Sequence, residues 1–494
     1  MKSAVIIGGG LGGLAAGMAL SKKGYAVTLL ERFARVGGYA TTWKRGGVWI
    51  EGVLHEIDDM GADSKKLKAL KSLGLEDVEF VKAPEFYRVI TSETDFVMPS
   101  GVESIKKALY ERFADEKAGI DRFFEIVGSI SKEVETLMEP SFTLYLKLAL
   151  FPLFFKNIIK YEKKSAKELL DECFKTDAIK SVLGANLGYY TDDASKLSAL
   201  LFAVAQYSFY SKGGWFVKGG SQKLSDAMAK AITKNGGNVI TNAEVAKIIV
   251  EGDIATGVEY THKKEQKTLL CDEVVNNASP LWAISAISSK ILSLKLKRDW
   301  AHGATLSVSS FGVYLILKGK KAPEGRNYTT FVFDKCKSLE DMQKSIYLPF
   351  EKRAFSITDY GVIDSALSDE DKRLLVIFVT DNYDDWSSLD AKEYQNKKIA
   401  AAQTLIKRAS QIYPDMEYDM LSYEAATPMT NERYTKNPKG AIYGYAQTLP
   451  QSGRFRNKFA KILPNLHNAS AWGAIGGGYS GAIYGGLMVG KKIQ

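Results

Sequence analysis

Cysteine and histidine are scarce in this sequence, with three and four copies among 494 residues. The odd number and wide separation of Cys173, Cys271 and Cys336 argue against a disulfide framework and against thiolate metal sites, and they favour a reducing, cytoplasmic setting. The histidines lack the spacing of metal ligands, so we expect no structural metal; they are His55, His262, His302 and His467.

Basic blocks and long hydrophobic runs are also missing. The net charge of +9 is spread along the chain, so we expect no nucleic-acid binding. Contact with an anionic membrane surface, or an ordinary solvated surface, explains this charge better. The apolar segment 141–159 is interrupted by Lys147, Pro152 and Lys156, so we expect no membrane-spanning helix there. At most we expect peripheral contact with the inner face of a membrane.

The chain opens with the pattern strand, glycine turn, helix. An apolar run at 4–7 is followed by glycines at 8, 9, 10, 12 and 13 and then by good helix composition up to Lys23. Gly8 permits the sharp turn, Gly10 lets the backbone approach a pyrophosphate, and Gly13 lets helix and strand pack closely. A pyrophosphate would then lie at the helix N-terminus, where amide groups and the helix dipole favour negative charge.

An acid follows the second expected strand at 25–30, where it can accept hydrogen bonds from an adenosine ribose. This context distinguishes a dinucleotide site from an ordinary β-turn-helix with an incidental surface glutamate. The residues that we predict to contact the dinucleotide are Gly8, Gly10, Leu11, Gly12, Gly13, Glu31 and Arg32.

A glycine pair, Gly37-Gly38, stands just beyond this acid and is followed by Tyr39. The arrangement resembles two-dinucleotide-binding-domain flavoproteins such as monoamine oxidases and carotenoid desaturases, which favours FAD over NAD. Two adjacent residues without side chains let the loop lie against the phosphates and the flavin end of the cofactor. A plain loop is the alternative for the pair taken alone.

The middle of the chain resembles the same flavoproteins. We expect a helix after Gly220, a strand at 238–241, a hairpin at 245–250 and 255–260, and a strand ending in a turn at 273–280. The resemblance implies that the backbone of Val245 holds the adenine side, and that Asn277 and Ala278 return the chain to the cofactor. Ordinary α/β packing explains each piece equally well on its own.

The last thirty residues predict a buried strand at 465–469 and a small-residue helix that opens on three glycines and runs to about Gly490. Bare amides at this helix start can face the flavin's pyrimidine edge, where negative charge develops on reduction. A glycine-rich tail is the alternative. The predicted contacts are Trp472, Gly477, Gly478, Tyr479, Ser480, Gly481 and Ala482.

With both ends considered, the chain resembles the FAD enzymes of the phytoene desaturase, carotenoid isomerase and retinol saturase group over nearly its full length. The stretches 427–434 and 440–444 are especially similar to the saturase and isomerase branch. Many relatives have arginine where this chain has Tyr39, and glycine and an acid where it has Ser470 and Ala471. Ala471 fits the carotenoid branch better than the amine oxidases.

This resemblance implies an FAD-dependent oxidoreductase that forms or reduces a carbon–carbon double bond in an apolar polyene, isoprenoid or other lipid. A redox-neutral polyene cis/trans isomerase, an amine oxidase-like enzyme and a non-catalytic flavin- or lipid-binding protein stay open. No second complete nucleotide fingerprint is present, so the electron donor or acceptor is oxygen, a quinone or a protein.

The length predicts two connected domains of α/β class. We expect a Rossmann-type FAD domain of the two-dinucleotide-binding kind from residues 1–80, 211–294 and 436–494. An interleaved α+β substrate domain would comprise 81–210 and 295–435.

On the substrate side, the run 148–155 with lysines behind it is consistent with a helix at a bilayer interface that admits a lipid. A buried helix of the substrate domain is the alternative, and it is favoured because short apolar runs are usually core. As candidate acids or bases we take His55 and Glu56, which follow the glycine pair, and Tyr443 with its neighbour Tyr445.

Overall fold

The opening glycine turn lies at the carboxyl edge of a six-stranded sheet in the computed structural model, which describes residues 1–138, 142–191, 193–301 and 304–494. Neighbouring strands run parallel except for the last pair. Their order is β10 (Asn238–Ile240), β2 (Ala26–Leu30), β1 (Ser3–Ile7), β14 (Glu273–Asn276), β21 (Leu466–Asn468) and β20 (Lys461–Leu463).

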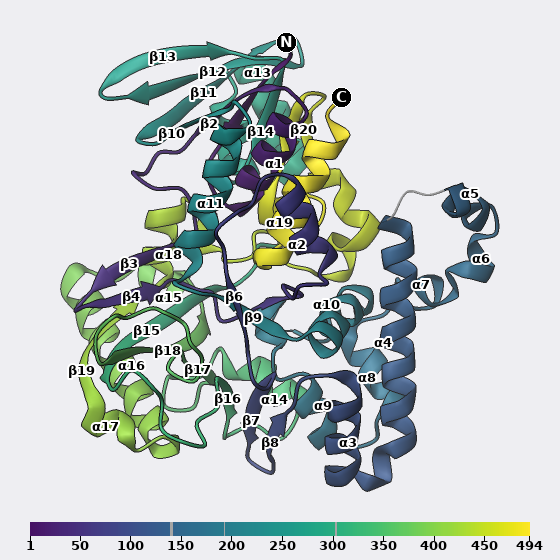
Figure 1. Ribbon diagram of the computed structural model, residues 1–494, viewed down its shortest axis with the longest axis vertical. Helices are drawn as coiled ribbons and strands as arrows, with labels where there is room; N and C mark the ends of the chain where they lie inside the picture. The colour runs from purple at the N-terminus through teal and green to yellow at the C-terminus, as the bar shows by residue number, and fades with distance from the viewer. Residues whose placement is uncertain (139–141, 192, 302–303) are drawn as a thin grey trace.

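Three helices build the core beside this sheet: α1 (Leu11–Lys22), α11 (Ser221–Lys234) and α19 (Gly478–Lys492). The first and the last helix of the chain pack against each other, so the two termini lie close together (Figure 1). An antiparallel sheet of β11 (Ala243–Glu251), β12 (Ile254–His262) and β13 (Glu265–Leu270) extends from the same region.

A seven-stranded sheet forms the other half of the molecule. All its pairs are antiparallel except β16 with β7. The order is β19 (Met420–Ala426), β15 (Ser309–Lys318), β18 (Lys372–Asp381), β17 (Phe355–Asp359), β16 (Thr329–Phe333), β7 (Tyr87–Thr91) and β8 (Asp95–Met98). Helix α16 (Ala391–Ile412) contributes Leu405 and Ala402 to the core beside it.

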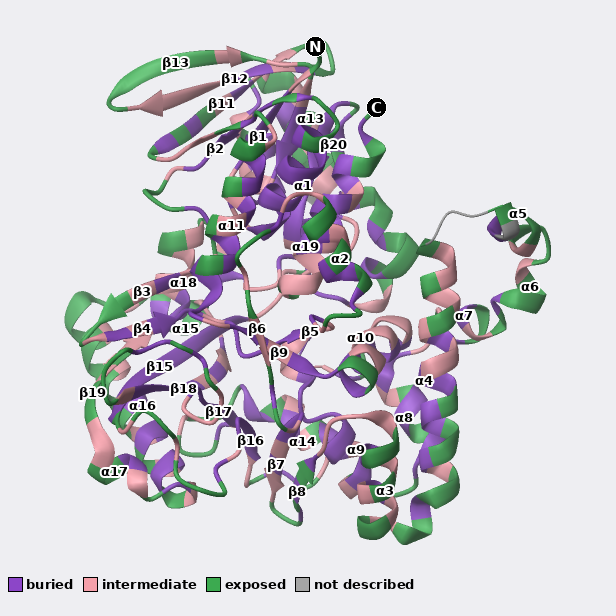
Figure 2. Cartoon of the chain, viewed as in Figure 1, coloured by how far each residue is buried: buried purple, intermediate pink, exposed green. Residues whose placement is uncertain are grey.

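A helical region packs beside this sheet around its own aromatic core (Figure 2). It comprises α3 (Val102–Arg112), α4 (Lys117–Met138), α8 (Ala166–Cys173), α9 (Asp177–Leu183) and α10 (Ala199–Lys212). Between the halves lies a small sheet of β5 (Ile57–Asp58), β9 (Gly214–Val217) and β6 (Phe80–Lys82).

The α/β class and the predicted opening strand, hairpin and closing helix are confirmed. All strands of the six-stranded sheet fall within 1–80, 211–294 and 436–494, and all strands of the seven-stranded sheet fall within 81–210 and 295–435. The boundaries themselves stay a prediction. Every helix within the described residues is too short or too polar to traverse a membrane. In the same ranges no cluster of three or more His, Cys, Asp or Glu side chains is arranged for a metal ion, and His302 lies outside them.

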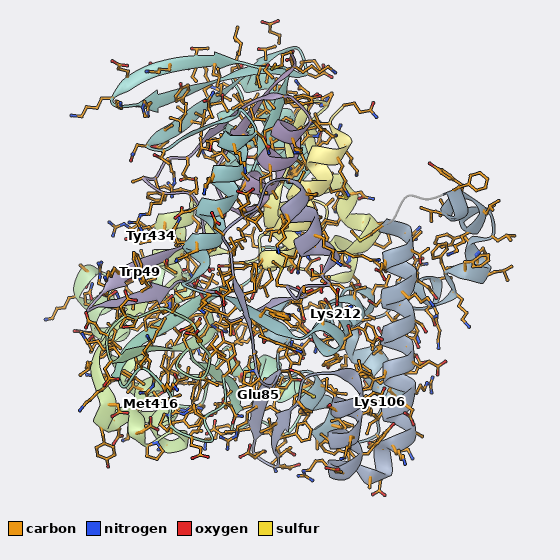
Figure 3. All side chains as sticks on the ribbon, viewed as in Figure 1. Trp49, Glu85, Lys106, Lys212, Met416 and Tyr434 are labelled. Atoms are coloured by element: carbon orange, nitrogen blue, oxygen red, sulfur yellow. The ribbon has the colours of Figure 1, made fainter. Side chains whose placement is uncertain are left out.

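The favoured prediction of a buried helix at 148–155 is wrong. The run is split between α5 (Phe142–Ala149) and α6 (Phe151–Phe154), which extend away from α4 (Figures 1 and 3), and it is followed by α7 (Lys156–Tyr161), which packs back against α4. The side chain of Phe142 is 80% exposed and that of Leu153 is 72% exposed, whereas Phe155 is buried. Pro152, in the first turn of α6, is tolerated there because those amides have no helical partner.

Candidate functional site

The opening glycines form a backbone cradle that excludes side chains. A Cβ atom on Gly13 would lie 2.3 Å from the carbonyl oxygen of Gly8, and one on Gly12 would lie 2.4 Å from the amide nitrogen of Ser470. Gly8 itself has φ +95°, in the region that favours glycine. Helix α1 begins after Gly10 without a side-chain cap, so its first amides are free to bind an anion.

Polar atoms without partners surround this cradle. Asn277 Oδ1, Ser279 Oγ and Ser470 Oγ are buried and accept or donate no hydrogen bond among the described residues. The Asn277 amide nitrogen donates to the carbonyl of Gly8 at 3.2 Å, which holds the turn after β14 beside the turn after β1. Buried polar groups normally have a hydrogen-bond partner, so these atoms indicate a polar ligand.

Glu31 is fixed by backbone amides. Its Oε2 atom accepts a hydrogen bond from Gly9 N at 2.7 Å and its Oε1 atom from Phe33 N at 2.9 Å, and burial raises its pKa. A carboxylate retains further lone pairs, so both oxygens can still accept from ribose hydroxyls. The Arg32 guanidinium lies 4.4 Å from the centroid of the Phe33 ring and donates to backbone carbonyls at 433 and 434, so its predicted cofactor contact stays a prediction.

The glycine pair lies against the opening turn. Gly37 N donates to Gly9 O at 2.7 Å, and a Cβ atom on Gly38 would lie 3.4 Å from Gly10 Cα. The Tyr39 hydroxyl donates to the carbonyls of Gly440 and Ala441 at 3.3 and 3.4 Å. Val245 lies in β11, and Ala243 at the start of that strand donates to the carbonyl of Glu31.

The closing helix, like the opening one, begins at glycines and has no side-chain cap. Gly477 caps α19 without a side-chain hydrogen bond, and its Cβ position lies 2.7 Å from Tyr443 Cβ. Gly476 and Gly478 both have positive φ, +117° and +77°. A Cβ atom on Gly486 would lie 2.1 Å from the carbonyl oxygen of Gly12, so α19 is packed directly on the backbone of α1.

Two predicted residues of α19 use their side chains within the protein. Tyr479 shares a hydrogen bond with Ser221 at 2.7 Å, and Ser221 donates to Glu51, whose pKa burial raises to about 7. Ser480 accepts from Lys66 Nζ at 2.6 Å and donates to Asp58.

Burial would raise the pKa of Asp58, but the Lys66 ammonium and two serine hydroxyls outweigh it and lower that pKa. Trp472 is also buried, and its ring nitrogen donates to Asn437 Oδ1. Contacts of these residues with a cofactor stay predictions, as do those of Leu11, Ala278, Gly481 and Ala482.

Three tyrosine hydroxyls hold the segment between β4 (Val48–Glu51) and β5. Tyr314 donates to the carbonyl of Gly52 at 2.8 Å, Tyr360 to that of Leu54, and Tyr328 to that of His55. All three tyrosines come from the half of the molecule that contains the seven-stranded sheet. Hydrogen bonds from tyrosines of one half of the molecule therefore hold the segment that carries His55 and Glu56.

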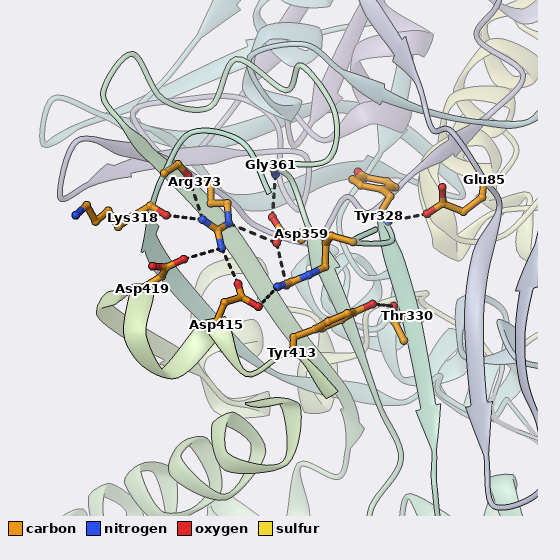
Figure 4. Close-up of polar contacts among 12 residues, drawn as sticks. Glu85, Lys318, Tyr328, Thr330, Asp359, Gly361, Arg373, Tyr413, Asp415 and Asp419 are labelled. Atoms are coloured by element: carbon orange, nitrogen blue, oxygen red, sulfur yellow. Dashed lines mark hydrogen bonds and ion pairs between the residues drawn. The ribbon is translucent and has the colours of Figure 1, made fainter. Parts of the chain in front are cut away.

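A buried ion network fixes the strands behind Tyr328 (Figure 4). Arg326 Nη1 lies 3.1 Å from Asp359 Oδ2, and Arg373 Nη2 lies 3.1 Å from Asp415 Oδ2 in α17 (Asp415–Asp419). Glu85 accepts a hydrogen bond from the amide of Tyr328 at 2.7 Å. The charges compensate one another inside the protein and fix the position of Tyr328.

His55 is a buried, neutral imidazole. Its ring packs edge-on against Phe378 and Tyr189, with centroid distances of 5.4 and 6.2 Å. Neither ring nitrogen has a hydrogen-bond partner among the described residues. Burial lowers the pKa of His55 to about 4, so the ring is uncharged at neutral pH.

Glu56 lies beside a cluster of aromatic side chains, which we call the aromatic group; it consists of His55, Tyr189, Tyr190 and Tyr443. The Tyr189 hydroxyl donates to Glu56 Oε1 at 3.4 Å, and burial raises the pKa of Glu56 well above its usual value. Burial also raises the pKa of Tyr443, and the Tyr443 hydroxyl contributes to the raised pKa values of Tyr189 and Tyr190. The structure therefore brings together the three catalytic candidates with two tyrosines that the sequence analysis missed. The run Gly188-Tyr189-Tyr190 was the available signal.

A model of the family described as flavin containing amine oxidoreductase matches residues 11–492. The chain belongs to this family. It is therefore a flavin-containing oxidoreductase whose cofactor is FAD. The cradle without side chains, the two uncapped helix starts and the unpartnered polar atoms around Gly12 fit this cofactor.

Several curated proteins have similar sequences. Prolycopene isomerase of Daucus carota is 24% identical, with 91% of this chain and 72% of the relative covered. All-trans-retinol 13,14-reductase of Macaca fascicularis is 24% identical, with 99% and 85% covered. A 4,4'-diapophytoene desaturase of Methylomonas is 25% identical, with 93% and 89% covered.

Solved structures of flavin amine oxidases share the fold. Putrescine oxidase bound to putrescine superposes with a TM-score of 0.60 at 17% identity, with 100% of this chain and 98% of that chain covered. Cyclohexylamine oxidase of Brevibacterium oxydans gives a TM-score of 0.61 at 15% identity, with 100% and 99% covered.

Proposed function

We propose that this protein uses FAD to form or reduce a carbon–carbon double bond in an apolar polyene, isoprenoid or other lipid. The observation that carries the proposal is the aromatic group beside the closing glycines. Tyr189, Tyr190 and Tyr443 share it with an uncharged His55, and such surroundings suit an apolar chain. Relatives named for prolycopene isomerisation, retinol reduction and diapophytoene desaturation support this substrate class.

The chain's own residues would bind the cofactor and orient the substrate. The amides after Gly10 would hold the pyrophosphate, and Glu31 would accept from the ribose. The uncapped start of α19 would face the flavin's pyrimidine edge. Bound FAD supplies the hydride acceptor or donor. His55, Glu56 and Tyr443 are the residues that we propose to exclude water and exchange protons with the substrate.

One experiment distinguishes the proposed reaction from its three alternatives, which are redox-neutral isomerisation, amine oxidation and binding without turnover. The purified protein is loaded with FAD and incubated without oxygen with carotenoids, retinoids, fatty acids and primary amines, once with the flavin photoreduced and once with it oxidised, because only oxidised flavin accepts electrons. A mass change of two hydrogens in a lipid supports the proposal. An isomer shift at constant mass indicates a redox-neutral isomerase, oxidation of an amine indicates an amine oxidase, and no change in any compound indicates binding alone.

We also propose that α5–α7 contacts an anionic membrane surface. The exposed apolar side chains of this protrusion are Phe142, Tyr145, Leu146, Leu148, Leu150, Leu153 and Phe154. Lys147 and Lys156 lie on the same protrusion and Lys163 follows it, so apolar insertion and attraction to anionic lipid act together. Figure 2 shows the protrusion as mostly exposed.

Vesicle flotation tests the membrane contact. The double variant Phe142→Ser, Leu153→Ser should lose binding to phosphatidylserine vesicles, because it removes apolar area from the inserted face. Leu421→Ser is the matched control, since Leu421 is an exposed leucine on β19, far along the chain. Equal flotation of the double variant and the control would contradict the contact.

A further inference from the structure

We propose that Glu56 is the proton donor when a substrate double bond is reduced, so that the protein works as a saturase. This inference rests on the proposed function and deepens it, because it assigns the direction of the reaction. The geometry around the carboxyl group, its lack of a cation and the properties of its neighbours each support the assignment.

One oxygen of Glu56 is presented without a partner. Oε2 is buried and forms no hydrogen bond among the described residues. It lies over Gly214 of β9, where a Cβ atom would approach it to 1.7 Å, so only glycine leaves room for this oxygen. The other oxygen, Oε1, has the weak contact with the Tyr189 hydroxyl at 3.4 Å. Glu56 Oε2 is therefore a buried carboxyl oxygen with no hydrogen-bond partner among the described residues.

The surroundings of Glu56 favour the protonated acid. Burial is the main cause of its raised pKa, and the negative charges of Glu85 and Asp58 act in the same direction. No ion pair to Glu56 is present in the described part of the chain. Other groups that face it are His55, which is neutral, and the hydroxyls of Tyr87, Tyr189, Tyr190 and Tyr328.

The two neighbouring acidic groups behave differently. Glu51 accepts hydrogen bonds from the amide and the hydroxyl of Ser221, and Asp58 is paired with Lys66. The remaining catalytic candidates are poor acids. His55 holds no proton to give at neutral pH, and burial raises the pKa of Tyr443 above that of an ordinary phenol.

Bound reduced flavin would supply two electrons as a hydride to one alkene carbon and would itself end oxidised. The adjacent carbon would form its new C–H bond from the π electron pair and the Glu56 proton. The Glu56 O–H bond would break, and its electron pair would stay on the carboxylate. A solvent proton restores the acid. Dithionite can serve as the reductant that recharges the flavin in a test.

The first measurement is infrared difference spectroscopy of wild type and Glu56→Gln over a pH series that crosses about pH 7, the pKa of Glu51, so that Glu51 is ionised at its upper end. The variant should lose a protonated carboxylic acid band. Glu51→Gln is the control, and it should alter this region only at low pH. This readout needs neither substrate nor turnover, and absence of the band in wild type would overturn the inference.

The second measurement is anaerobic reoxidation of the dithionite-reduced enzyme by a polyene. Glu56→Gln should stay folded and keep the flavin spectrum but reoxidise about 100-fold or more slowly, with partial recovery in Glu56→Asp. Reoxidation of Glu56→Gln at the wild-type rate would overturn the inference and leave the proposed function standing. Failure of the reduced wild type to react with any polyene would overturn the donor role, and failure of the oxidised wild type to react with any lipid as well would overturn the proposed function.

Discussion

Among single residues, Arg456 is unusual because its guanidinium is fully buried and has no carboxylate partner in the described part of the chain. It donates to the carbonyls of Gly473 at 2.8 Å, Gln451 at 3.0 Å and Ala471 at 2.5 Å. Burial lowers its pKa to about 10. The planar fork of donors thus holds the loop that leads into α19.

We expect Arg456→Lys to destabilise the protein, because an ammonium cannot reach several carbonyls in different directions. The free energy of unfolding should fall by about 3 kcal/mol. FAD should also bind more weakly, since the loop positions the closing glycines. Denaturant unfolding and FAD titration measure both effects. Arg454→Lys is the control, because the exposed Arg454 forms a surface ion pair with Glu162 and lies over the neighbouring Phe455 ring. Similar losses in both variants would contradict the assigned role.

Glu56 should make the stability depend on pH. Its folded pKa is raised, so between the unfolded and folded pKa values the unfolded chain has released a proton that the folded protein keeps. Stability therefore falls as pH rises through this window, by about 1.4 kcal/mol per pH unit. Glu56→Gln removes the effect, so its advantage in unfolding free energy over wild type should grow as pH rises above the ordinary glutamate pKa of 4.5 toward the raised folded pKa.

Glu56→Asp keeps an ionisable group and serves as the control. It should follow the wild-type slope more closely than Glu56→Gln does. Parallel curves for wild type and Glu56→Gln would mean that the carboxyl group is not protonated in the folded protein.

Sequence reasoning found residues at this scale when a motif marked them. His55 and Glu56 follow the Gly37-Gly38 pair and were expected near the flavin end. Tyr189 contacts Glu56 across 133 residues, so the run Gly188-Tyr189-Tyr190 did not indicate which residue it meets. Arg456 lies in a polar segment that resembles exposed surface, so it had no local signal. Such residues are selected by tertiary proximity, which a sequence motif does not encode.

Among the elements, the pairing of α1 with α19 depends on close backbone approach. Gly486→Ala would place a methyl group 2.1 Å from the carbonyl oxygen of Gly12. We expect a loss of about 2 kcal/mol or more of unfolding free energy and partial loss of bound FAD, because the helices must separate. Thermal unfolding and the flavin absorbance of the purified variant measure this.

The adjacent residue provides a matched control. A Cβ atom on Gly485 would lie 3.5 Å from the nearest atom, the carbonyl oxygen of Ser470, which is an ordinary contact. Gly485→Ala should therefore be neutral or gain up to about 1 kcal/mol from its better helix propensity. Loss of FAD in this variant as well would mean that the helix tolerates no added side chain, whichever face it points to.

The elements also show where sequence patterns reach their limit. The opening strand, turn and helix were predictable because the glycine spacing and the pattern of apolar residues indicate the same elements. The run 148–155 was ambiguous because an apolar stretch has the same composition whether it is buried or exposed. Its exposure in α5–α7 follows from what α4 and the other helices leave uncovered, which is a property of the assembled fold.

In the whole molecule, distant segments meet in both large sheets. The parallel pair β7–β16 joins Arg88 to Thr330, and β1 pairs with β14, which lies more than two hundred residues later. The prediction of two domains rested on the chain length and on motifs at both ends of the chain, and it stays a prediction. The order of strands in the seven-stranded sheet was not, because its long-range pairings carry no turn signal.

The position of the site between the chain ends predicts how FAD stabilises the protein. A ligand at 100 times its dissociation constant adds about 2.7 kcal/mol to the folded state. Hydrogen exchange should slow most in the first turns of α1 and α19, because we expect their uncapped amides to bind the cofactor. The strands β15 and β18 serve as the internal reference, because their paired backbone lies in a separate core. If hydrogen exchange slowed only in β15 and β18, the cofactor would bind elsewhere. A site formed by segments from both ends of the chain would then be contradicted.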